Sequence, residues 1–365
     1  MQHGCISSSG SLPPRSIVSR KDQELHRTTL ARLTGLALVA GTVAGPTASA
    51  SAAGTLNGAG SSLIAPLMAN WSADFNARNT VAVNYSAVGS GAGIAQISAR
   101  TVDFGASDAP MTPAQFSGCN GCVQIPWALT ATVAAVNIPG VKTLKLTGPV
   151  IAQIYLGQIT NWNDPRIKSL NKGAKLPSMQ ITPVYRSDGS GDTYVITDFL
   201  SRVSSTWKSQ VGNATSVSFP KGVGGKGNDG VTAVVGSTQG SIGYVSAYYA
   251  IQHHLSVAAL RNRAGNFEYP NLKNIKAAAA VVKSVPANNE MHIVNPSKKA
   301  KIAYPMSTFT YAIVPTTSPQ ATALSLFVRY AVSATGQRFA PALDFQPVPA
   351  VVAAAARRTA AKVHS

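Results

Sequence analysis

Acidic residues are scarce in this chain. Its 365 residues include 13 Asp and Glu against 31 Lys and Arg, which gives a formal net charge of +18. Such an excess makes nucleic acid the first partner to consider. The basic residues are scattered, however, with no arginine-rich run and no basic helix with interleaved aromatic residues. We therefore expect no nucleic-acid partner, because a surface suited to anions or to an acidic cell envelope explains the charge as well.

Long apolar runs are also missing. No stretch of 18 or more apolar residues occurs, so we expect no transmembrane span in the mature protein. With 45% hydrophobic and 12% charged residues, the composition is that of a globular protein. The length suggests two domains of ordinary size.

Cysteine is the third scarce residue, with Cys5, Cys119 and Cys122 as the only examples. A single C-x-x-C pair cannot supply a four-thiolate zinc site. Glycine and asparagine around the pair predict a turn, whereas a thioredoxin-like redox site would need the start of a helix. In an exported protein the remaining interpretation is a small-loop disulfide, so we expect Cys119 to be bonded to Cys122.

The first 52 residues have the features of a targeting segment. Arg27 and Arg32 flank a short polar stretch, and the apolar run 33–43 has about the length of a signal-peptide core. Small residues at 48–52 offer cleavage sites, with no cysteine for a lipid anchor. We expect residues 1–52 to be a signal segment, and the mature protein to be exported to the periplasm or the outer face of the cell envelope.

Helix and strand patterns alternate along the rest of the chain. Apolar residues at helical spacing predict an amphipathic helix over 62–77, and the near-continuous apolar run 130–137 is typical of a strand covered on both faces. This alternation predicts an α/β chain with mostly parallel sheets. The alanine-rich end, 351–365, is low in complexity, and we expect it to be a flexible tail.

Three Gly/Ser-rich turns, at 58–62, 89–91 and 188–191, each precede a predicted helix. A helix N-terminus presents unpaired backbone N–H groups and the positive end of its dipole. Glycine lets the backbone approach an anion, and serine adds a hydroxyl donor. Each turn alone fits an ordinary helix cap, but three in one chain favour a shared anion site.

Charged residues accompany these turns. Arg186 lies two residues before Asp188, which could hold its guanidinium in position to bind two oxygens of a tetrahedral anion. The alternative is a surface ion pair of little energetic value. Asp108 would repel an anion unless the anion carries a proton that the carboxylate accepts. Phosphate carries one at neutral pH and sulfate does not, so one aspartate could select phosphate over sulfate.

The motifs lie within longer stretches that resemble the phosphate-binding proteins of ABC phosphate importers over nearly the whole mature region. The matching stretches are LNGAGSSLIAPLMANW (56–71), VNYSAVGSGAGIAQISARTVDFGASDAPM (83–111), YLGQITNWNDPRI (155–167), YRSDGSGDTYVITDFL (185–200), GVGGKGNDGV (222–231), GSIGYV (240–245), YPMSTFTYAIV (304–314) and LDFQPVP (343–349).

The resemblance implies a two-lobed, periplasmic-binding-protein-like α/β fold (type II) with its ligand in the cleft between the lobes. Lobe I would comprise 54–128 plus 304–350, and lobe II 129–303. The implied function is capture of inorganic phosphate and its delivery to the permease subunits of an ABC importer. We expect a monomer with no cofactor, no metal and no catalytic residues.

The resemblance also implies the phosphate contacts, residue by residue. Backbone and hydroxyl groups of the three turns would donate to the anion, one carboxylate would accept its proton, and one guanidinium would pair with it. The expected contacts are Ser62, Leu63, Ser90, Asp108, Arg186, Ser190, Gly191 and Asp192, with Asp188 orienting the arginine.

Two of these positions depart from the family pattern. Leu63 stands where phenylalanine is common, and its backbone donor survives that change. Asp192 stands where threonine is common. Its carboxylate either turns outward at the start of a helix, which is the default expectation, or faces the ligand. In the second case a more protonated phosphate would be favoured, so that affinity would rise as the pH falls.

Other functions have weaker support. The G-x-G-x-x-G at 222–227 lacks both the preceding apolar strand and the later acidic residue of a dinucleotide-binding fold. The pair His253 and His254 is not accompanied by other metal-ligating residues. An enzyme acting on phosphate esters would need an activated nucleophile or a metal cluster, and the candidate pocket contains neither. A sensor or surface adhesin with the same fold is the alternative that Asp192 keeps open.

Overall fold

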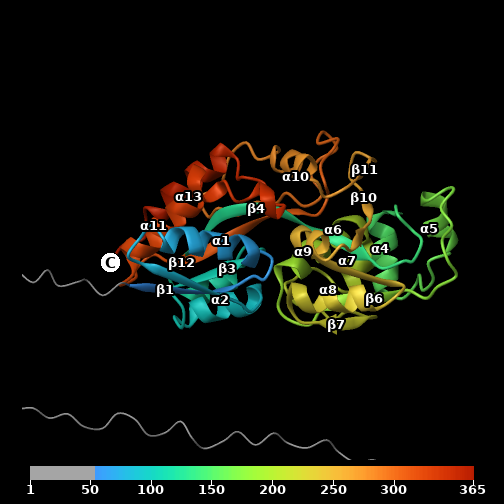
Figure 1. Cartoon of the computed structure of the whole chain (residues 1–365), viewed down its shortest axis with the longest axis horizontal. Helices are drawn as coiled ribbons and strands as arrows, with labels where there is room; N and C mark the ends of the chain where they lie inside the picture. The colour runs from blue at the N-terminus through green and yellow to red at the C-terminus, as the bar shows by residue number, and fades with distance from the viewer. Residues whose placement is uncertain (1–53) are drawn as a thin grey trace, which may run out of the picture. The chain divides into compact units, whose positions relative to one another are not determined.

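The computed structural model describes residues 54–365, so the predicted signal segment lies outside the described residues. Within them the chain is a mixed α/β structure built on a curled sheet of nine strands, with a separate small sheet of three (Figure 1). The α/β fold class is therefore confirmed. Among the described helices, none has the length and apolar character needed to cross a membrane.

The first part of the sheet, sheet A, has the strand order β2-β1-β3-β12-β4. Its parallel strands are β1 (Thr55–Gly60), β2 (Ala82–Ala87) and β3 (Phe104–Ser107). Helices α1 (Ala65–Asn76) and α2 (Ser90–Ser98) lie on opposite sides of these strands in Figure 1. The helix predicted over 62–77 is thus α1, with its proline tolerated in the first turn.

The second part, sheet B, has the order β4-β8-β6-β7, with β9 beside β4. Strands β6 (Thr182–Arg186), β7 (Val223–Gly225) and β8 (Ser241–Ser246) are parallel. The helices that follow or precede them are α4 (Gly148–Tyr155), α6 (Gly191–Val203), α8 (Gly227–Ser237) and α9 (Ala247–Gln252).

Strand β4 (Cys122–Val136) belongs to both sheets. It pairs with β12 (Ser307–Pro315) as far as Ala131, and with β8 from Thr132 onward. The pairs β3–β12, β12–β4 and β4–β8 are all antiparallel. The expectation of mostly parallel sheets is therefore wrong at the centre, because two long strands run in opposite directions between the two sheets.

The remaining elements connect or cover these sheets. They are α3 (Pro113–Cys119), β5 (Lys145–Leu146), α5 (Pro165–Leu170), α7 (Ser205–Gln210), β9 (Ser256–Val257), β10 (Ala259–Arg261), β11 (Phe267–Glu268), α10 (Leu272–Ala279), α11 (Ala321–Ala331), α12 (Ala334–Gln337), the 3-10 helix Pro341–Leu343 and α13 (Ala350–Ala360).

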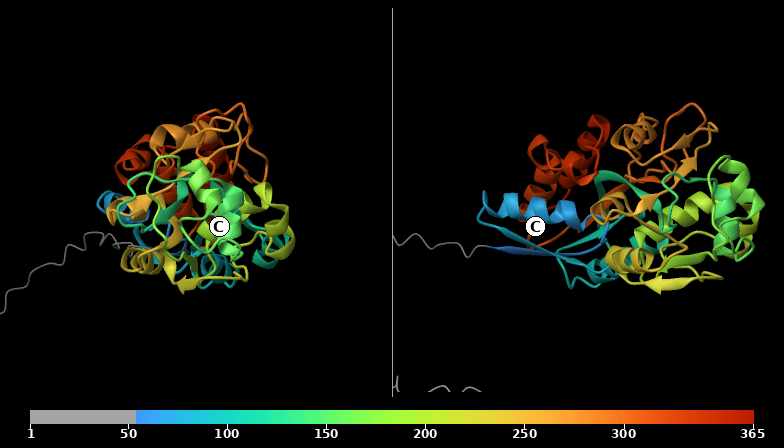
Figure 2. Two further views of the ribbon diagram at one scale, coloured as in Figure 1. Left: turned by 90° about the vertical axis from the view of Figure 1, so that its right-hand side faces the viewer. Right: turned by 45° about the vertical axis from the view of Figure 1, so that its right-hand side comes forward.

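The alanine-rich end of the chain is ordered, which corrects the expectation of a flexible tail. Helix α13 buries Val352 and Ala356 against β4 and α11, and Figure 2 shows this red segment against the body of the protein. After the helix, the backbone N–H of His364 donates to the carbonyl of Thr316. Alanine has the highest helix propensity, so a low-complexity alanine run forms a helix readily when an apolar surface receives it.

Each sheet has its own apolar core. On the sheet A side, Trp71, Trp127 and Phe327 pack in one buried cluster. On the sheet B side, Tyr155 and Trp207 contact each other edge to face. These cores hold the strand ends, and hence the turns that follow them, in fixed positions.

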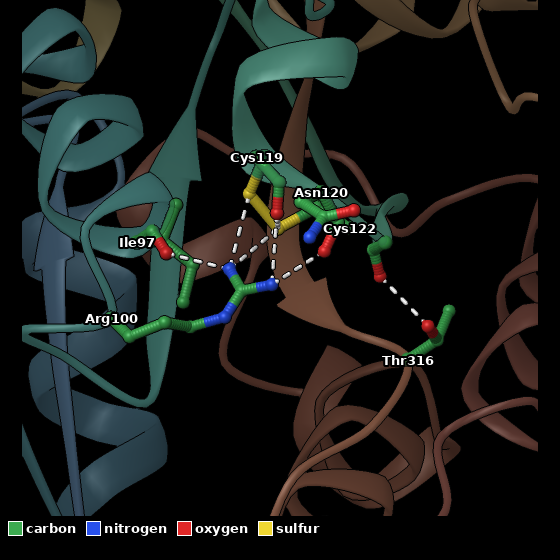
Figure 3. The surroundings of a disulfide bond; sticks show 7 residues. Ile97, Arg100, Cys119, Asn120, Cys122 and Thr316 are labelled. Atoms are coloured by element: carbon green, nitrogen blue, oxygen red, sulfur yellow. Dashed lines mark hydrogen bonds between the residues drawn. A yellow bond between two sulfur atoms is a disulfide. The ribbon is translucent and has the colours of Figure 1, made fainter.

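The expected disulfide between Cys119 and Cys122 is present (Figure 3). Arg100, just after α2, donates from Nη1 to both sulfur atoms, at 3.4 and 3.2 Å. Its Nη2 donates to the carbonyls of Cys119 and Asn120. The disulfide and this arginine together fasten the C-terminal end of α2 to the start of β4.

Replacing Cys119 and Cys122 with serine should lower the free energy of unfolding by about 2 kcal/mol, the chain-entropy value for closing so short a loop. Urea unfolding of the oxidised wild type and the double variant measures the difference. The wild type treated with a reductant should resemble the variant. Equal stability of the oxidised and reduced proteins would show that the crosslink contributes nothing.

Candidate functional site

The three Gly/Ser-rich turns meet where elements of sheet A face elements of sheet B. One turn follows β1, the second starts α2, and the third links β6 to α6. The backbone N–H of Gly91 donates to the carbonyl of Gly189 at 2.9 Å. The N–H of Gly191 donates to Ser90 Oγ at 3.1 Å. Turns from distant parts of the chain therefore come within hydrogen-bond distance of one another.

Glycine is required at two of these positions. A Cβ on Gly191 would lie 2.4 Å from the Cβ of Asp108, so only glycine permits this approach. Gly89 has φ of +93°, in the left-handed region, and a Cβ there would lie 2.4 Å from Asp188 Oδ2. The backbone of one turn thus lies directly against a carboxylate of another segment.

Asp108 follows β3 and is 1% exposed. Its Oδ2 accepts hydrogen bonds from the hydroxyls of Ser61 at 2.6 Å and Ser90 at 3.4 Å. Its Oδ1 accepts none from the described residues. Burial and the nearby charge of Asp192 raise the pKa of Asp108 to about 7, although the hydroxyl donors and Arg186 oppose the rise. This carboxyl can therefore exchange a proton near neutral pH.

Arg186 ends β6 and is 5% exposed. Its Nε donates to Asp188 Oδ1 at 2.8 Å, and its Nη1 donates to Asp192 Oδ2 at 3.0 Å. Burial alone would lower the pKa of Arg186, but the two carboxylates outweigh it, so the pKa lies above its ordinary value. For Asp188, burial is likewise outweighed, chiefly by Arg186, and its pKa is lowered. The guanidinium therefore stays positively charged. Asp188 accepts a hydrogen bond from it, as the sequence predicts for the residue that orients Arg186.

Asp192 faces inward, so the default expectation of an outward carboxylate is wrong. The residue lies in the first turn of α6 and is fully buried. Its Oδ1 accepts from Thr132 Oγ1 at 2.6 Å, and its Oδ2 accepts from Asn228 Nδ2 at 2.8 Å as well as from Arg186. These donors compensate for its burial. Burial still raises the pKa of Asp192, although Arg186 opposes the rise.

The other predicted contact residues surround this group. Ser62 Oγ accepts from Asn228 Nδ2 at 3.0 Å. The backbone N–H of Leu63 donates to Ser61 Oγ at 3.0 Å, so that donor is engaged within its own turn. Ser190 is the N-cap of α6 and accepts from the backbone of Thr193. Among the predicted serine hydroxyls, that of Ser90 donates to Asp108, whereas those of Ser62 and Ser190 donate to no partner within residues 54–365.

Sequence reasoning missed three members of the cluster, namely Ser61, Thr132 and Asn228. Thr132 is a polar residue within an apolar strand, which is itself a signal because a buried hydroxyl needs a partner. Asn228 lies in the glycine-rich stretch 222–231, and an asparagine in such a stretch gives no local signal of a buried role. Its Oδ1 also accepts from the backbone N–H of Ser246 at 2.7 Å, which fixes its side chain.

Asparagine in place of Asp108 should make stability less dependent on pH. Because its folded-state pKa is raised, Asp108 contributes stability that is present below its unfolded pKa and is lost as the pH rises through about 7. The wild type should therefore lose on the order of 3 kcal/mol between pH 5 and pH 8 in phosphate-free buffer, and Asp108→Asn much less. Urea unfolding at both pH values tests this. The exposed Asp229→Asn is the control, and parallel pH profiles for wild type and Asp108→Asn would contradict the prediction.

From residue 54 onward, no group of three or more His, Cys, Asp or Glu side chains is placed so that it could hold a metal ion. The arrangement is instead that of a buried polar cluster with one guanidinium, three carboxyl groups and several hydroxyls. Its guanidinium and hydroxyls are donors of the kind that bind the oxygens of a tetrahedral oxyanion.

Comparisons with known proteins first define the class. The family model for a PBP superfamily domain matches residues 45–335. A periplasmic phosphate-binding protein bound with phosphate has the same fold, with a TM-score of 0.67 at 21% identity, over 83% of this chain and 93% of that chain. A phosphate-binding protein from Stenotrophomonas maltophilia gives a TM-score of 0.66 at 19% identity over the same shares. The periplasmic-binding-protein-like fold is therefore confirmed.

Relatives in sequence narrow the class. The phosphate-binding protein PstS of Xylella fastidiosa (strain Temecula1) is 39% identical over 321 residues, 87% of either chain. PstS of Haemophilus influenzae is 39% identical over 305 residues, covering 82% of this chain and 90% of the relative. The chain belongs to the PBP superfamily and, within it, to the family of PstS phosphate-binding proteins. The resemblance stated from the sequence motifs is confirmed.

Proposed function

We propose that this protein is an extracytoplasmic solute-binding protein that captures inorganic phosphate and delivers it to the permease of an ABC importer. The observation that carries the proposal is the buried guanidinium of Arg186 in a cluster with Asp108 and the hydroxyl of Ser90. A charged arginine supplies the attraction for an anion, and a carboxylate beside it accepts only from an anion that carries a proton. Phosphate fits both requirements at neutral pH.

The proposed contacts follow the geometry. Asp108 Oδ1, which accepts no hydrogen bond from the described residues, would take the proton of a phosphate hydroxyl. Hydroxyls of Ser62, Ser90 and Ser190 and the backbone of Leu63 and Gly191 would donate to its oxygens. Asp192, whose Oδ2 accepts from Arg186 Nη1 at 3.0 Å, would lie beside an anion bound to that guanidinium and would accept a second phosphate proton.

The lobe boundaries are part of the same proposal. Residues 54–128 with 304–350 would form lobe I and 129–303 lobe II, with α13 added to lobe I because it packs on α11. The hydrogen bonds between Gly91 and Gly189 and between Ser90 and Gly191 would then join the lobes across the cleft. Closure around the ligand is the expected motion. Export of a monomer and the absence of catalysis belong to the proposal as well.

A phosphate sensor or surface adhesin is the second candidate. The observation that favours it is the ion pair between Asp192 and Arg186, because it places a protein carboxylate on the guanidinium that an anion would need. In that case the fold would be kept while phosphate binding is weak.

Calorimetric titration of the mature protein separates the two candidates. Phosphate at pH 6 and pH 8 should bind with a dissociation constant in the micromolar range or tighter, about −8 kcal/mol or better. Sulfate should not bind. Absence of phosphate binding at both pH values would overturn the transport assignment and favour the sensor or adhesin. Hydrolysis of a chromogenic phosphomonoester would instead identify an enzyme.

A further inference from the structure

A second concentration of positive charge lies outside the candidate phosphate site, on the sheet B side. A cavity of about 450 Å³ is lined by three arginines together with threonine and asparagine side chains, and by no acidic residue. We call it the three-arginine cavity, after Arg202, Arg261 and Arg263. Its volume falls in the range typical of small-molecule sites.

The topology brings its lining residues together. Strands β5 and β10 are parallel, with Leu146 opposite Leu260, so the next residues along each strand, Thr147 and Arg261, are neighbours. Helix α4 begins directly after Thr147 and packs tightly on the end of α6. A Cβ on Gly148 would lie 2.4 Å from Val203 Cγ2. Figure 1 shows α4, α6 and β10 in the same region of the protein.

Two of the arginines, one at the end of β10 and one in the turn after it, lie on a backbone that is held by hydrogen bonds. Asn262, between them, is 5% exposed. Its Nδ2 donates to the carbonyls of Lys301 and Ala303 at 2.8 and 3.1 Å. Its Oδ1 accepts from backbone N–H groups of the same turn. The backbone positions of Arg261 and Arg263 are therefore fixed before any ligand arrives, which reduces the entropic cost of binding.

The positive charge of this loop is uncompensated within the described residues. Arg261 and Arg263 form neither an ion pair nor a side-chain hydrogen bond there, whereas Arg202 donates from Nε to Asp198 Oδ1 at 2.8 Å. Three guanidinium groups and one neighbouring carboxylate leave an excess of two positive charges at the cavity. A surface ion pair does not explain such a cluster.

A threonine side chain also lines the cavity. Thr147 is 5% exposed and is the N-cap of α4, yet its side chain makes no cap hydrogen bond and no other within residues 54–365. It lines the cavity together with Gly148 and Pro149 of the first helical turn. The positive end of a helix dipole and a free hydroxyl donor therefore accompany the arginines.

We propose that the three-arginine cavity binds a small polyvalent oxyanion, a condensed phosphate or a polycarboxylate. Guanidinium groups bind carboxylate and phosphate oxygens in pairs, and an anion with several charged groups can engage more than one arginine at once. A single orthophosphate is too small to use the whole cavity. The site is separate from the phosphate cluster and does not depend on the function proposed for it.

Titration with tripolyphosphate and with citrate tests the proposal on the mature protein. Orthophosphate is added in excess beforehand so that the candidate phosphate site does not contribute, and about 0.15 M salt screens diffuse surface attraction. We expect one molecule of tripolyphosphate or citrate to bind per chain, and the tighter of the two identifies phosphate or carboxylate as the preferred chemistry. If neither tripolyphosphate nor citrate binds, the proposal is overturned.

Charge-matched variants show where the anion binds. Arg261→Ala/Arg263→Ala should weaken binding at least about tenfold, as the loss of charged hydrogen bonds predicts. Arg357→Ala/Arg358→Ala removes the same charge from exposed positions on α13 and should leave the affinity unchanged. Thr147→Val, which keeps the shape of the side chain, should weaken binding less. Equal affinity in the two double variants would mean that the anion responds only to net charge, and would overturn the proposed site.

Discussion

Alanine in place of Arg186 should abolish phosphate binding and destabilise the protein by about 3–5 kcal/mol. The guanidinium is the only buried cation among the described residues of the cluster, and it compensates for both Asp188 and Asp192. Removing one partner of a buried ion pair leaves the other charge unpaired, at a cost of that size. Calorimetric titration and urea unfolding measure the two effects.

Two further variants make this result interpretable. Arg186→Lys keeps the charge but loses the planar fork, so it should fold and bind phosphate at least about a hundredfold more weakly. Arg166→Ala breaks an Arg–Asp pair with the same two-residue spacing, but this arginine side chain is 46% exposed. It should change neither affinity nor stability by a measurable amount. Wild-type affinity in Arg186→Lys would remove Arg186 from the proposed phosphate contacts.

Threonine in place of Asp192 should raise phosphate affinity at pH 8 by about tenfold or more, and should flatten its pH dependence. The wild-type carboxylate competes with phosphate for Arg186 and repels it, an effect worth several kcal/mol at short distance in a partly screened site. Because burial raises the pKa of Asp192, lowering the pH neutralises it, and wild-type affinity should rise as the pH falls. Threonine does not titrate and offers a hydroxyl donor.

Titrations at several pH values between 6 and 8 test this prediction. Asp229→Thr is the matched control, since it removes an exposed carboxylate beside Asn228 and should preserve the wild-type pH profile. Asp108, with a pKa of about 7, and phosphate itself titrate in this range, so some pH dependence should persist in Asp192→Thr. Unchanged affinity at pH 8 together with an unchanged profile would show that Asp192 does not act on the ligand.

Local features of the fold were predictable from the sequence. The helical spacing of apolar residues over 62–77 located α1, and the glycine-rich turns located the N-termini of α2 and α6. Helical spacing and glycine-rich turns are set by residues that are close together in the sequence, so they can be read from the sequence alone. The apolar pattern predicts strand β4 only from residue 130, although the strand begins at Cys122. Its first half contains Gln124 and Pro126, and it is a strand because β12 pairs with it throughout.

The orientation of Asp192 was not predictable for a similar reason. A carboxylate in the first turn of a helix usually faces solvent, where it interacts with the helix dipole. Here its donors come from β4, β6 and α8, through Thr132, Arg186 and Asn228. No local pattern in the sequence predicts that β4, β6 and α8 meet at this carboxylate.

The change of partner along β4 has a mechanical consequence. At Ala131 the strand still pairs with Ser307 of β12, and at Thr132 it pairs with Ser246 of β8. A twist of sheet A relative to sheet B would therefore change the backbone torsion angles of β4 between Ala131 and Thr132. Thr132 Oγ1 is also the donor to Asp192. The residue at which the central strand changes partners is therefore bonded directly to a buried carboxylate of the candidate site.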